Sequence, residues 1–241
     1  MRVLALDAAL GGFSAALADG PEVRSVSTGA QDALERGVGL LEGLLTEAGL
    51  SLRDLDRIAV GLGPGSFTGV RIAVSYAKSL AYATGVPLVG ISSYDALEPD
   101  DAPLPVLTVV HGRRGVICAR RRDAAGEAVA CGRTAEVLDR LLIGPPGALA
   151  VSGNTEGVLS EIAERGWTVR VLPSRANVPA VAIAQLATTR PPSRTPHALA
   201  PDYGESPAVR LPASVTRRSA PGSAPPTAYG GGAPRRGAPS P

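Results

Sequence analysis

The chain has 241 residues, of which 44% are hydrophobic and only 3% aromatic, and its formal net charge is +2. A chain of this length can bury a sizeable core, and that core must be built mainly from aliphatic side chains. Residues 1–190 hold 18 basic and 20 acidic side chains. This part therefore lacks the positive charge of a protein that binds many RNA phosphates by itself.

Apolar runs and turn residues predict strands and helices in a repeating order along the first 190 residues. A first group gives three strands, a helix, a strand, a helix and a strand, at 2–7, 13–18, 23–28, 30–48, 57–62, 69–84 and 87–91. A weaker second group follows at 106–110, 116–121, 128–131, 135–142, 148–151, 155–165, 168–172 and 178–188. This order predicts an α/β protein of two tandem lobes with mixed sheets, the second lobe being reduced.

The expected domains are a first lobe at 1–97, a second lobe at 104–190 and a tail at 191–241. The tail holds 12 of the 22 prolines, mixed with Gly, Ser, Ala and Arg, so we expect most of it to be disordered.

Cysteine spacing and apolar run length bear on the environment of the protein. Cys118 and Cys131 lie in β-like runs without a Cys-x-x-Cys spacing, which favours two buried free thiols over a zinc site or a disulfide framework. The apolar run Val3–Leu6 is too short for a signal peptide, and we find no run that reaches the length of a membrane span. We therefore expect a cytoplasmic protein with no membrane contact.

The most specific motif joins a predicted strand to a predicted helix. Its residues of interest are Gly63, Pro64, Gly65, Ser66, Phe67, Thr68, Gly69 and Arg71. The spacing excludes a Walker loop, because Lys78 lies well inside the helix, and a dinucleotide fingerprint, because the third glycine comes one residue late. A nucleophile elbow would need glycine at Pro64. An anion-binding loop and a structural tight turn remain, and the tight turn is favoured.

Two predicted helices carry regular apolar stripes. In the second helix, small side chains recur at Ala73, Ala77 and Ala81, beside Val70 and Val74. The first helix has a heptad-like spacing of Leu34, Val38, Leu41 and Leu45. It also contains Gly39 and Gly43, and glycine inside a helix costs about 1 kcal/mol relative to alanine. Close contact with another helix would explain these glycines; the alternative is that both stripes face only their own sheet.

The block Gly63–Ile72, with flanking segments Leu52–Val60 and Ala77–Ala81, resembles the hallmark block of the bacterial TsaB family, also called YeaZ. The resemblance covers roughly residues 1–190. It agrees with the element order, which is that of the lobes of the actin, sugar-kinase and heat-shock ATPase superfamily.

The resemblance implies a non-catalytic scaffold in the machinery that makes N6-threonylcarbamoyladenosine in tRNA, next to the anticodon. In that machinery another enzyme forms threonylcarbamoyl-adenylate, TsaD transfers the group, TsaB holds TsaD in a competent form, and the ATPase TsaE joins. The implied partners are therefore a TsaD-like protein and a TsaE-like ATPase, with tRNA reached through the complex. The resemblance implies that the protein has no cofactor of its own, and that ATP or ADP can bind at the interface with TsaD.

The resemblance also implies that the two helices form a bundle with those of TsaD, or pair the protein with itself, and that the glycine block orders the start of the second helix. The implied interface residues are Leu34, Val38, Leu41, Leu45, Val70, Ala73, Val74, Ala77 and Ala81. Residues Pro201–Pro212 resemble the family's closing segment, an extended strip with a tyrosine that packs on the body. The chain departs from the family pattern at Ala33, at Gly37–Gly39 and, within this strip, at Tyr203–Gly204–Glu205.

Asp7 is the first candidate for nucleotide contact, because the superfamily places a carboxylate for metal-bound nucleotide at the end of the first strand. The hydroxyl residue that usually follows is replaced by Ala8. The favoured alternative is that Asp7 accepts backbone N–H groups in a turn. Larger relatives bind metal through a His-x-x-x-His pair, whereas this chain has only His111 and His197. We therefore expect no catalytic and no metal-binding residues.

Two other functions are compatible with the fold. One is an enzyme, either an M22-like metalloprotease or a small stand-alone ATPase that uses Val151–Thr155 as a second phosphate loop; an N-cap alone also explains that segment. The other is a general chaperone or protein-binding module without a link to tRNA.

Overall fold

The structure is a computed structural model that describes residues 1–29, 33–113 and 115–204, apart from the side chains of residues 33–35. The first lobe contains strands β1 (Arg2–Asp7), β2 (Ser14–Asp19), β3 (Glu22–Ser27), β4 (Arg57–Gly61) and β5 (Leu88–Ile91). Its helices are α1 (Ala33–Glu47), the short η2 (Leu52–Asp54), α2 (Phe67–Thr84) and α3 (Ser93–Leu97). The short helices η2 and α3 are additions to the elements that the sequence predicted.

The second lobe follows the same plan with less helix. Its strands are β6 (Val106–His111), β7 (Val116–Asp123), β8 (Gly126–Arg133), β9 (Ala148–Gly153) and β10 (Thr168–Val171). Helices α4 (Thr134–Leu141) and α5 (Leu159–Glu164) pack on this sheet, and α6 (Pro179–Ala187) and η3 (Pro196–Ala198) follow in the chain. The helix expected at 155–165 begins only at Leu159, because Val158 and not Asn154 occupies its N-cap position.

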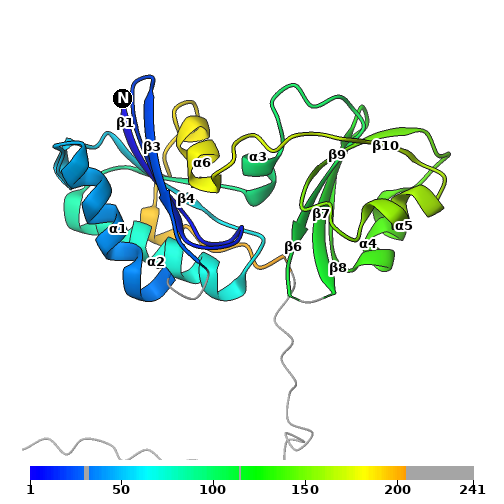
Figure 1. The fold of residues 1–241 in the computed structure, drawn as a ribbon, viewed down its shortest axis with the longest axis horizontal. Helices are drawn as coiled ribbons and strands as arrows, with labels where there is room; N and C mark the ends of the chain where they lie inside the picture. Colours follow the sequence, from blue (N-terminus) through cyan, green and yellow to red (C-terminus); the bar gives the residue numbers. More distant parts are fainter. Residues whose placement is uncertain (30–32, 114, 205–241) are drawn as a thin grey trace, which may run out of the picture. The chain divides into compact units, whose positions relative to one another are not determined.

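The two sheets have one topology (Figure 1). The strand order is β3-β2-β1-β4-β5 in the first sheet and β8-β7-β6-β9-β10 in the second. In each sheet the first three strands are antiparallel neighbours, and the fourth and fifth continue parallel to the first. The predicted α/β fold of two tandem lobes with mixed sheets is confirmed, and the second sheet has the five strands that the sequence predicted.

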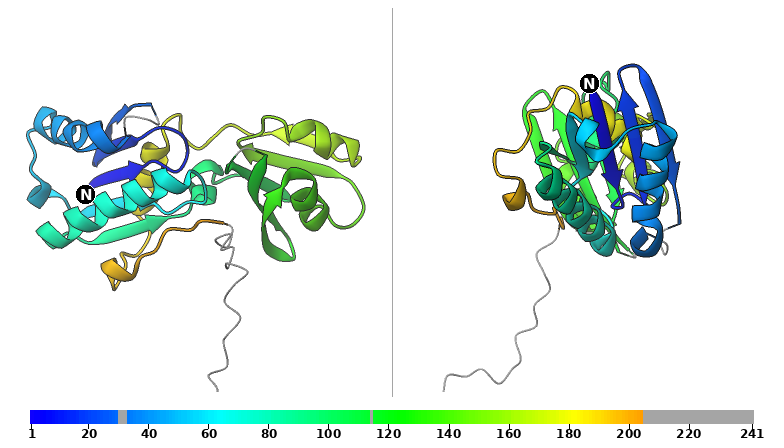
Figure 2. Two further views of the ribbon diagram at one scale, coloured as in Figure 1. Left: turned by 90° about the horizontal axis from the view of Figure 1, so that it is seen from below. Right: turned by 90° about the vertical axis from the view of Figure 1, so that its left-hand side faces the viewer.

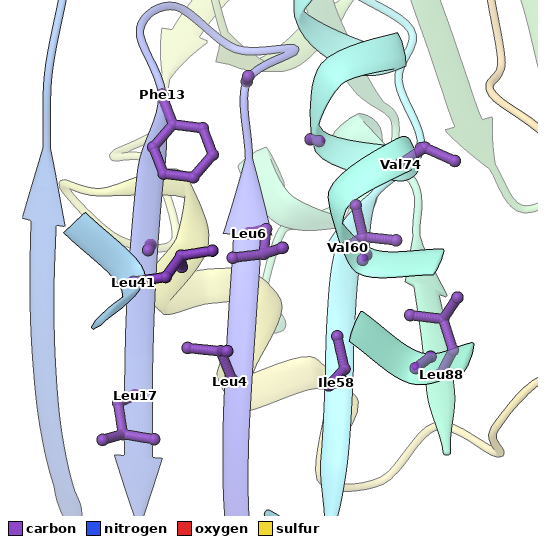
Figure 3. Packing of buried hydrophobic residues seen from close by; sticks show 14 of the residues in the cluster. Leu4, Leu6, Phe13, Leu17, Leu41, Ile58, Val60, Val74 and Leu88 are labelled. Carbon is purple, nitrogen blue, oxygen red and sulfur yellow. The ribbon is translucent and has the colours of Figure 1, made fainter. Parts of the chain in front are cut away.

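Alternation along the central strand β1 divides the first core into two layers. Leu4 and Leu6 point to the side covered by α1 and α2, where they meet residues such as Phe13, Leu41 and Val74 (Figure 3). Val3 and Ala5 point to the opposite side and pack with α6. The central strand is therefore buried on both faces, which is typical of a strand with a continuous apolar sequence.

Helix α6 packs on the first sheet, which corrects the predicted boundary of the second lobe at residue 190. Its alanine-rich surface lies against β1, β2 and β4. The guanidinium of Arg57 donates to the carbonyl oxygens of Ala187 (2.5 Å) and Arg190 (2.7 Å) at the end of this helix. The chain therefore crosses from the first lobe to the second and returns (Figure 2).

The segment after α6 is also part of the first lobe up to residue 204, so the tail predicted from residue 191 begins too early. The amide of Ser193 donates to the carbonyl of Leu88 (2.7 Å), and that of Asp202 to the carbonyl of Leu62 (2.6 Å). Leu199 packs against the first core. The rest of the predicted tail, 205–241, lies outside the described residues.

Cys118 and Cys131 form a disulfide, so the expectation of two free thiols is wrong. The two residues face each other on the antiparallel strands β7 and β8. The turn between these strands consists of Ala124 and Ala125, and it sets the register that brings the two cysteines together. The spacing of the cysteines in a predicted hairpin was therefore the signal that the sequence reasoning missed.

In residues 1–29, 33–113 and 115–204, no helix is both long and apolar enough to cross a bilayer.

The inward position of the α2 stripe gives a first prediction. Ala77 has no exposed surface, so Ala77→Arg buries a charge and should lower the free energy of unfolding by about 3 kcal/mol or more in urea denaturation. Ser79→Arg, on the exposed side of the same helix, should leave the unfolding midpoint nearly unchanged. Equal stability of the two variants would contradict this placement.

Candidate functional site

The glycine motif forms the connection from β4 to α2. The peptide bond between Gly63 and Pro64 is cis, and Ser66 is the N-cap of α2. The hydroxyl of Ser66 accepts a hydrogen bond from the amide of Gly69 (3.2 Å). The amide of Ser66 donates to the carbonyl of Ala9 in the β1–β2 loop (2.8 Å). The loop thus begins α2 and attaches it to the end of β1.

Each glycine of the motif allows a close approach of another backbone segment. A Cβ atom at Gly69 would overlap the carbonyl oxygen of Ala8, and one at Gly65 would overlap that of Ala9. At Gly63 the nearest group is the carbonyl oxygen of Asp202. The carbonyl oxygens of Ala8 and Ala9 therefore pack against the glycine motif, and the amides of Ser66 and Gly69 are already hydrogen-bonded within the chain. This arrangement favours the tight turn over the anion-binding loop.

Asp7 is fully buried at the end of β1. One carboxylate oxygen accepts a hydrogen bond from the amide of Leu10 (3.0 Å), as the turn interpretation predicted. The other oxygen has no hydrogen-bond partner among the residues that the structure describes, and it faces Gly61, where a Cβ would overlap it. Burial raises the pKa of Asp7 to about 6. Contact of Asp7 with a nucleotide stays a prediction.

The predicted interface residues divide between core and surface. Seven of them are buried inside this chain, namely Leu41, Leu45, Val70, Ala73, Val74, Ala77 and Ala81. They pack on the strands of the first sheet and have almost no surface left for a partner, which is the alternative that the sequence left open. Val38 is 49% exposed, and the side chain of Leu34 lies outside the described residues. The expected contact stripe therefore faces inward.

A different set of residues forms the surface of the same helices, which we call the outer helix face. Spacings of three and four place these residues on one side of each helix. They are Val38, Gly39, Glu42 and Gly43 of α1, and Arg71, Ser75, Ser79 and Tyr82 of α2. Tyr82 is 94% exposed. An exposed aromatic ring of this kind is typical of a residue that a partner covers.

The glycines of α1 differ in what surrounds them. At Gly37 a Cβ would come within 2.9 Å of the Tyr76 ring, so this glycine makes room for a ring that packs against Phe13 inside the chain. At Gly39 and Gly43 a Cβ would meet no described atom within 4 Å. Packing among the described residues therefore gives no reason for these two glycines, and they leave a shallow, smooth strip on the outer helix face.

An aromatic group covers the start of α2. The ring of Phe67 is 57% exposed, and Tyr203 packs against it with ring centroids 4.8 Å apart. The guanidinium of Arg71 lies 5.3 Å from the same ring. The segment at Pro201–Gly204 thus lies on the glycine motif at residues 63–71, which we call the signature loop.

The remaining sequence candidates are not brought together. His111 ends β6 and His197 lies in η3, and both side chains are exposed. Asn154 was expected to cap a helix. Its side-chain oxygen instead accepts a hydrogen bond from the backbone amide of His111 (3.2 Å), and its backbone amide donates to the carbonyl of Val109 (2.8 Å). The described residues contain no group of three or more His, Cys, Asp and Glu side chains placed to hold a metal.

A charged cluster that sequence reasoning missed joins α3 to the second sheet. Glu98 is buried and accepts hydrogen bonds from Arg120 (3.1 Å), Arg122 and the hydroxyl of Thr108. Arg120 also donates to Asp95 (2.6 Å), and these carboxylates raise its pKa against the opposing effect of burial. The cluster borders a cavity of about 650 Å³. The available signal was the pair Arg120 and Arg122, which lie on one face of the predicted strand at 116–121 and its continuation. Arginines on a strand that is partly buried need carboxylate partners, and this predicts a charged cluster.

Comparison with known proteins gives the family. Residues 29–184 match the family model described as "TsaD: tRNA N6-adenosine threonylcarbamoyltransferase", which is more than half of the chain. The chain belongs to the TsaD/TsaB (YeaZ) family. The TsaB protein of Escherichia coli is 38% identical over 94 residues, which cover 39% of this chain and 41% of that protein.

Two further relatives extend the comparison within the TsaD/TsaB family. The tRNA N6-adenosine threonylcarbamoyltransferase of Moorella thermoacetica is 35% identical over 114 residues, 39% of this chain and 33% of that enzyme. The structure of YeaZ from Pseudomonas aeruginosa superposes with a TM-score of 0.62 at 22% identity and covers 84% of this chain and 99% of YeaZ, which shows a shared fold. The curated relatives named here are matched over less than half of their length.

A pair of glycine variants tests the packing of the signature loop. Gly69→Ala should lower the free energy of unfolding by about 2 kcal/mol or more, because its Cβ would overlap the Ala8 carbonyl. Gly39→Ala should raise it by up to about 1 kcal/mol, because its Cβ enters open space and alanine favours helix. Urea denaturation measures both, and the same sign for the two variants would refute this account of the loop.

The pKa of Asp7 predicts how stability depends on pH. Its pKa rises from 3.8 to about 6 on folding, so the folded protein holds the proton more tightly than the unfolded chain. The resulting stabilisation is complete below about pH 4 and is lost as the pH rises through 6, a change of about 3 kcal/mol.

The variant Asp7→Asn cannot titrate, so its free energy of unfolding should lose this decline between pH 4 and pH 7, whereas Asp101→Asn at the surface should keep it. Parallel pH profiles of the Asp7→Asn variant and the unchanged protein would exclude Asp7 as the cause.

Proposed function

We propose that the protein is a non-catalytic subunit of the machinery that forms N6-threonylcarbamoyladenosine in tRNA, and that it binds a TsaD-like protein through the outer helix face. The family supports the pathway, because relatives carry the names TsaB and tRNA N6-adenosine threonylcarbamoyltransferase. The observation that carries the proposal is the signature loop, whose glycines are used for packing within the chain.

The loop geometry supports a scaffold in preference to a phosphate-binding enzyme. The carbonyl oxygens of Ala8 and Ala9 lie against Gly69 and Gly65, and Ser66 uses its amide and hydroxyl inside the chain. One oxygen of Asp7 is committed to the turn at Leu10. These groups hold α2 in place on the sheet, and a helix in a fixed position is what a docking surface requires.

The outer helix face supports the mode of docking. Gly39 and Gly43 are one turn apart, and each costs about 1 kcal/mol of helix stability relative to alanine. The strip that they leave lets a partner helix approach closely, and Val38 and Tyr82 offer apolar surface beside it. The partner contact therefore lies on the side of α1 and α2 opposite to the apolar stripes that the sequence singled out.

The wider assembly follows from the same proposal. The TsaD-like partner supplies the chemistry of threonylcarbamoyl transfer, and the tRNA contacts the complex. A TsaE-like ATPase, a nucleotide at the interface with the partner, and pairing of the protein with itself through the same face remain predictions from the family.

Association with the TsaD-like protein of the same organism tests the docking face. Gly43→Arg should weaken binding in calorimetric titration by about thirtyfold or more, because the long side chain fills the strip where the partner helix approaches. The same variant should unfold at the same or a higher urea concentration, because the arginine meets no described atom of the chain and favours helix over glycine.

Ala163→Arg on α5 is the matched control, since it adds the same side chain to an exposed helix position in the second lobe. It should bind with unchanged affinity. Absence of association at micromolar concentration, or equal affinity of the two arginine variants, would reject the proposed docking face.

A further inference from the structure

The disulfide between Cys118 and Cys131 lies under the last described residues of the chain. Cys118 is buried in a small cluster with Tyr94, Leu97 and Val110, whereas Cys131 at its edge is partly exposed. In Figure 1 the orange segment after η3 ends beside the second sheet. The residue in contact with the disulfide is Gly204, where a Cβ atom would overlap both sulfur atoms.

Gly204 ends a short segment that is attached to the signature loop; we call residues 201–204 the C-terminal strip. The amide of Asp202 donates to the carbonyl of Leu62 (2.6 Å), and the amide of Gly204 donates to the side chain of Asp202 (2.8 Å). Tyr203 stacks on Phe67. The Cβ of Pro64 would come within 3.2 Å of a Cβ at Gly204. The strip is thus held between the loop and the disulfide.

Gly204 packs directly on the bonded sulfurs, because a Cβ atom at this position would overlap both of them. Reduction converts the bonded pair into two S–H groups whose side chains rotate independently, while β7 and β8 keep their pairing. The neighbour with the fewest attachments is the strip, because it carries no strand pairing of its own.

We propose that the Cys118–Cys131 disulfide is a reducible site whose redox state controls the attachment of the C-terminal strip to the signature loop. Its reaction partner is a dithiol that can close its own intramolecular disulfide, either a small molecule such as dithiothreitol or a dithiol oxidoreductase. This inference is independent of the proposed function.

The exchange balances without a further reactant. A thiolate of the dithiol attacks the more exposed sulfur, that of Cys131, to form a mixed disulfide, and Cys118 leaves as a thiolate. The second thiol of the reductant then attacks the reductant's first sulfur, which is bonded to Cys131, and Cys131 leaves as a thiolate. Both cysteine thiolates take protons, so the protein gains two thiols and the dithiol is oxidised to a disulfide.

Hydrogen exchange of the full chain, followed by mass spectrometry, tests the proposal. In protein purified without reductant, blocking with iodoacetamide should leave both cysteines unmodified, and the peptide that contains Asp202 and Gly204 should exchange slowly. After treatment with dithiothreitol this peptide should exchange about tenfold faster or more, because the strip is released. Peptides from α6 should not change, which shows that the fold is intact.

Variants separate the effect of the sulfurs from that of backbone strain. Gly204→Ala should release the strip in the oxidised protein, because its Cβ overlaps the sulfurs. Alanine is also strained at the φ of +69° found there. In a Cys118→Ala/Cys131→Ala background the strain persists but the overlap is gone, so the added Gly204→Ala should cost much less protection. The double alanine variant alone should be insensitive to dithiothreitol.

Three results would overturn the proposal. The first is alkylation of both cysteines in protein that has never met a reductant. The second is equal exchange of the strip peptide before and after reduction. The third is equal loss of protection by Gly204→Ala in both backgrounds, which would assign the effect to backbone strain.

Discussion

The structure depends on one close contact, between the backbone of the β1–β2 loop and the glycine motif before α2. The carbonyl oxygens of Ala8 and Ala9 reach the backbone at Gly69 and Gly65 only because these residues have no side chain. This contact sets where α2 begins, and the Ser66 cap sets its direction. The inner side of α2 then completes the first core, and its outer side remains for other contacts.

Much of the fold followed from the sequence, because alternation and helical spacing are local signals. The strands and the long helices occur where the patterns predict them. The repeated order of elements correctly predicted two lobes of one topology. Periodicity does not tell which sheet a helix covers. The sequence therefore assigned helix α6 to the wrong lobe, because an alanine-rich helix does not indicate which sheet it covers. Long-range contacts place it on the first sheet, among them those of Arg57 with the end of α6.

The candidate site was predictable in position but not in detail. The glycine motif marked the right loop, whereas the small-residue stripe marked the wrong side of α2, because a buried helix face and a partner face have the same composition. The glycines of α1 were ambiguous in the same way: Gly37 accommodates Tyr76, while Gly39 and Gly43 face open space. The departure from the family pattern at Gly204 is explained only by the disulfide, because a Cβ atom at this position would overlap its sulfur atoms.

A glycine loop that holds its own backbone in place of phosphate fits a protein that supports the chemistry of a partner. The most direct test of this account is depletion of the protein in its host, followed by mass spectrometry of tRNA nucleosides. The account predicts a loss of N6-threonylcarbamoyladenosine that is restored by the unchanged chain but not by Gly43→Arg. An unchanged level of this nucleoside after depletion would contradict it.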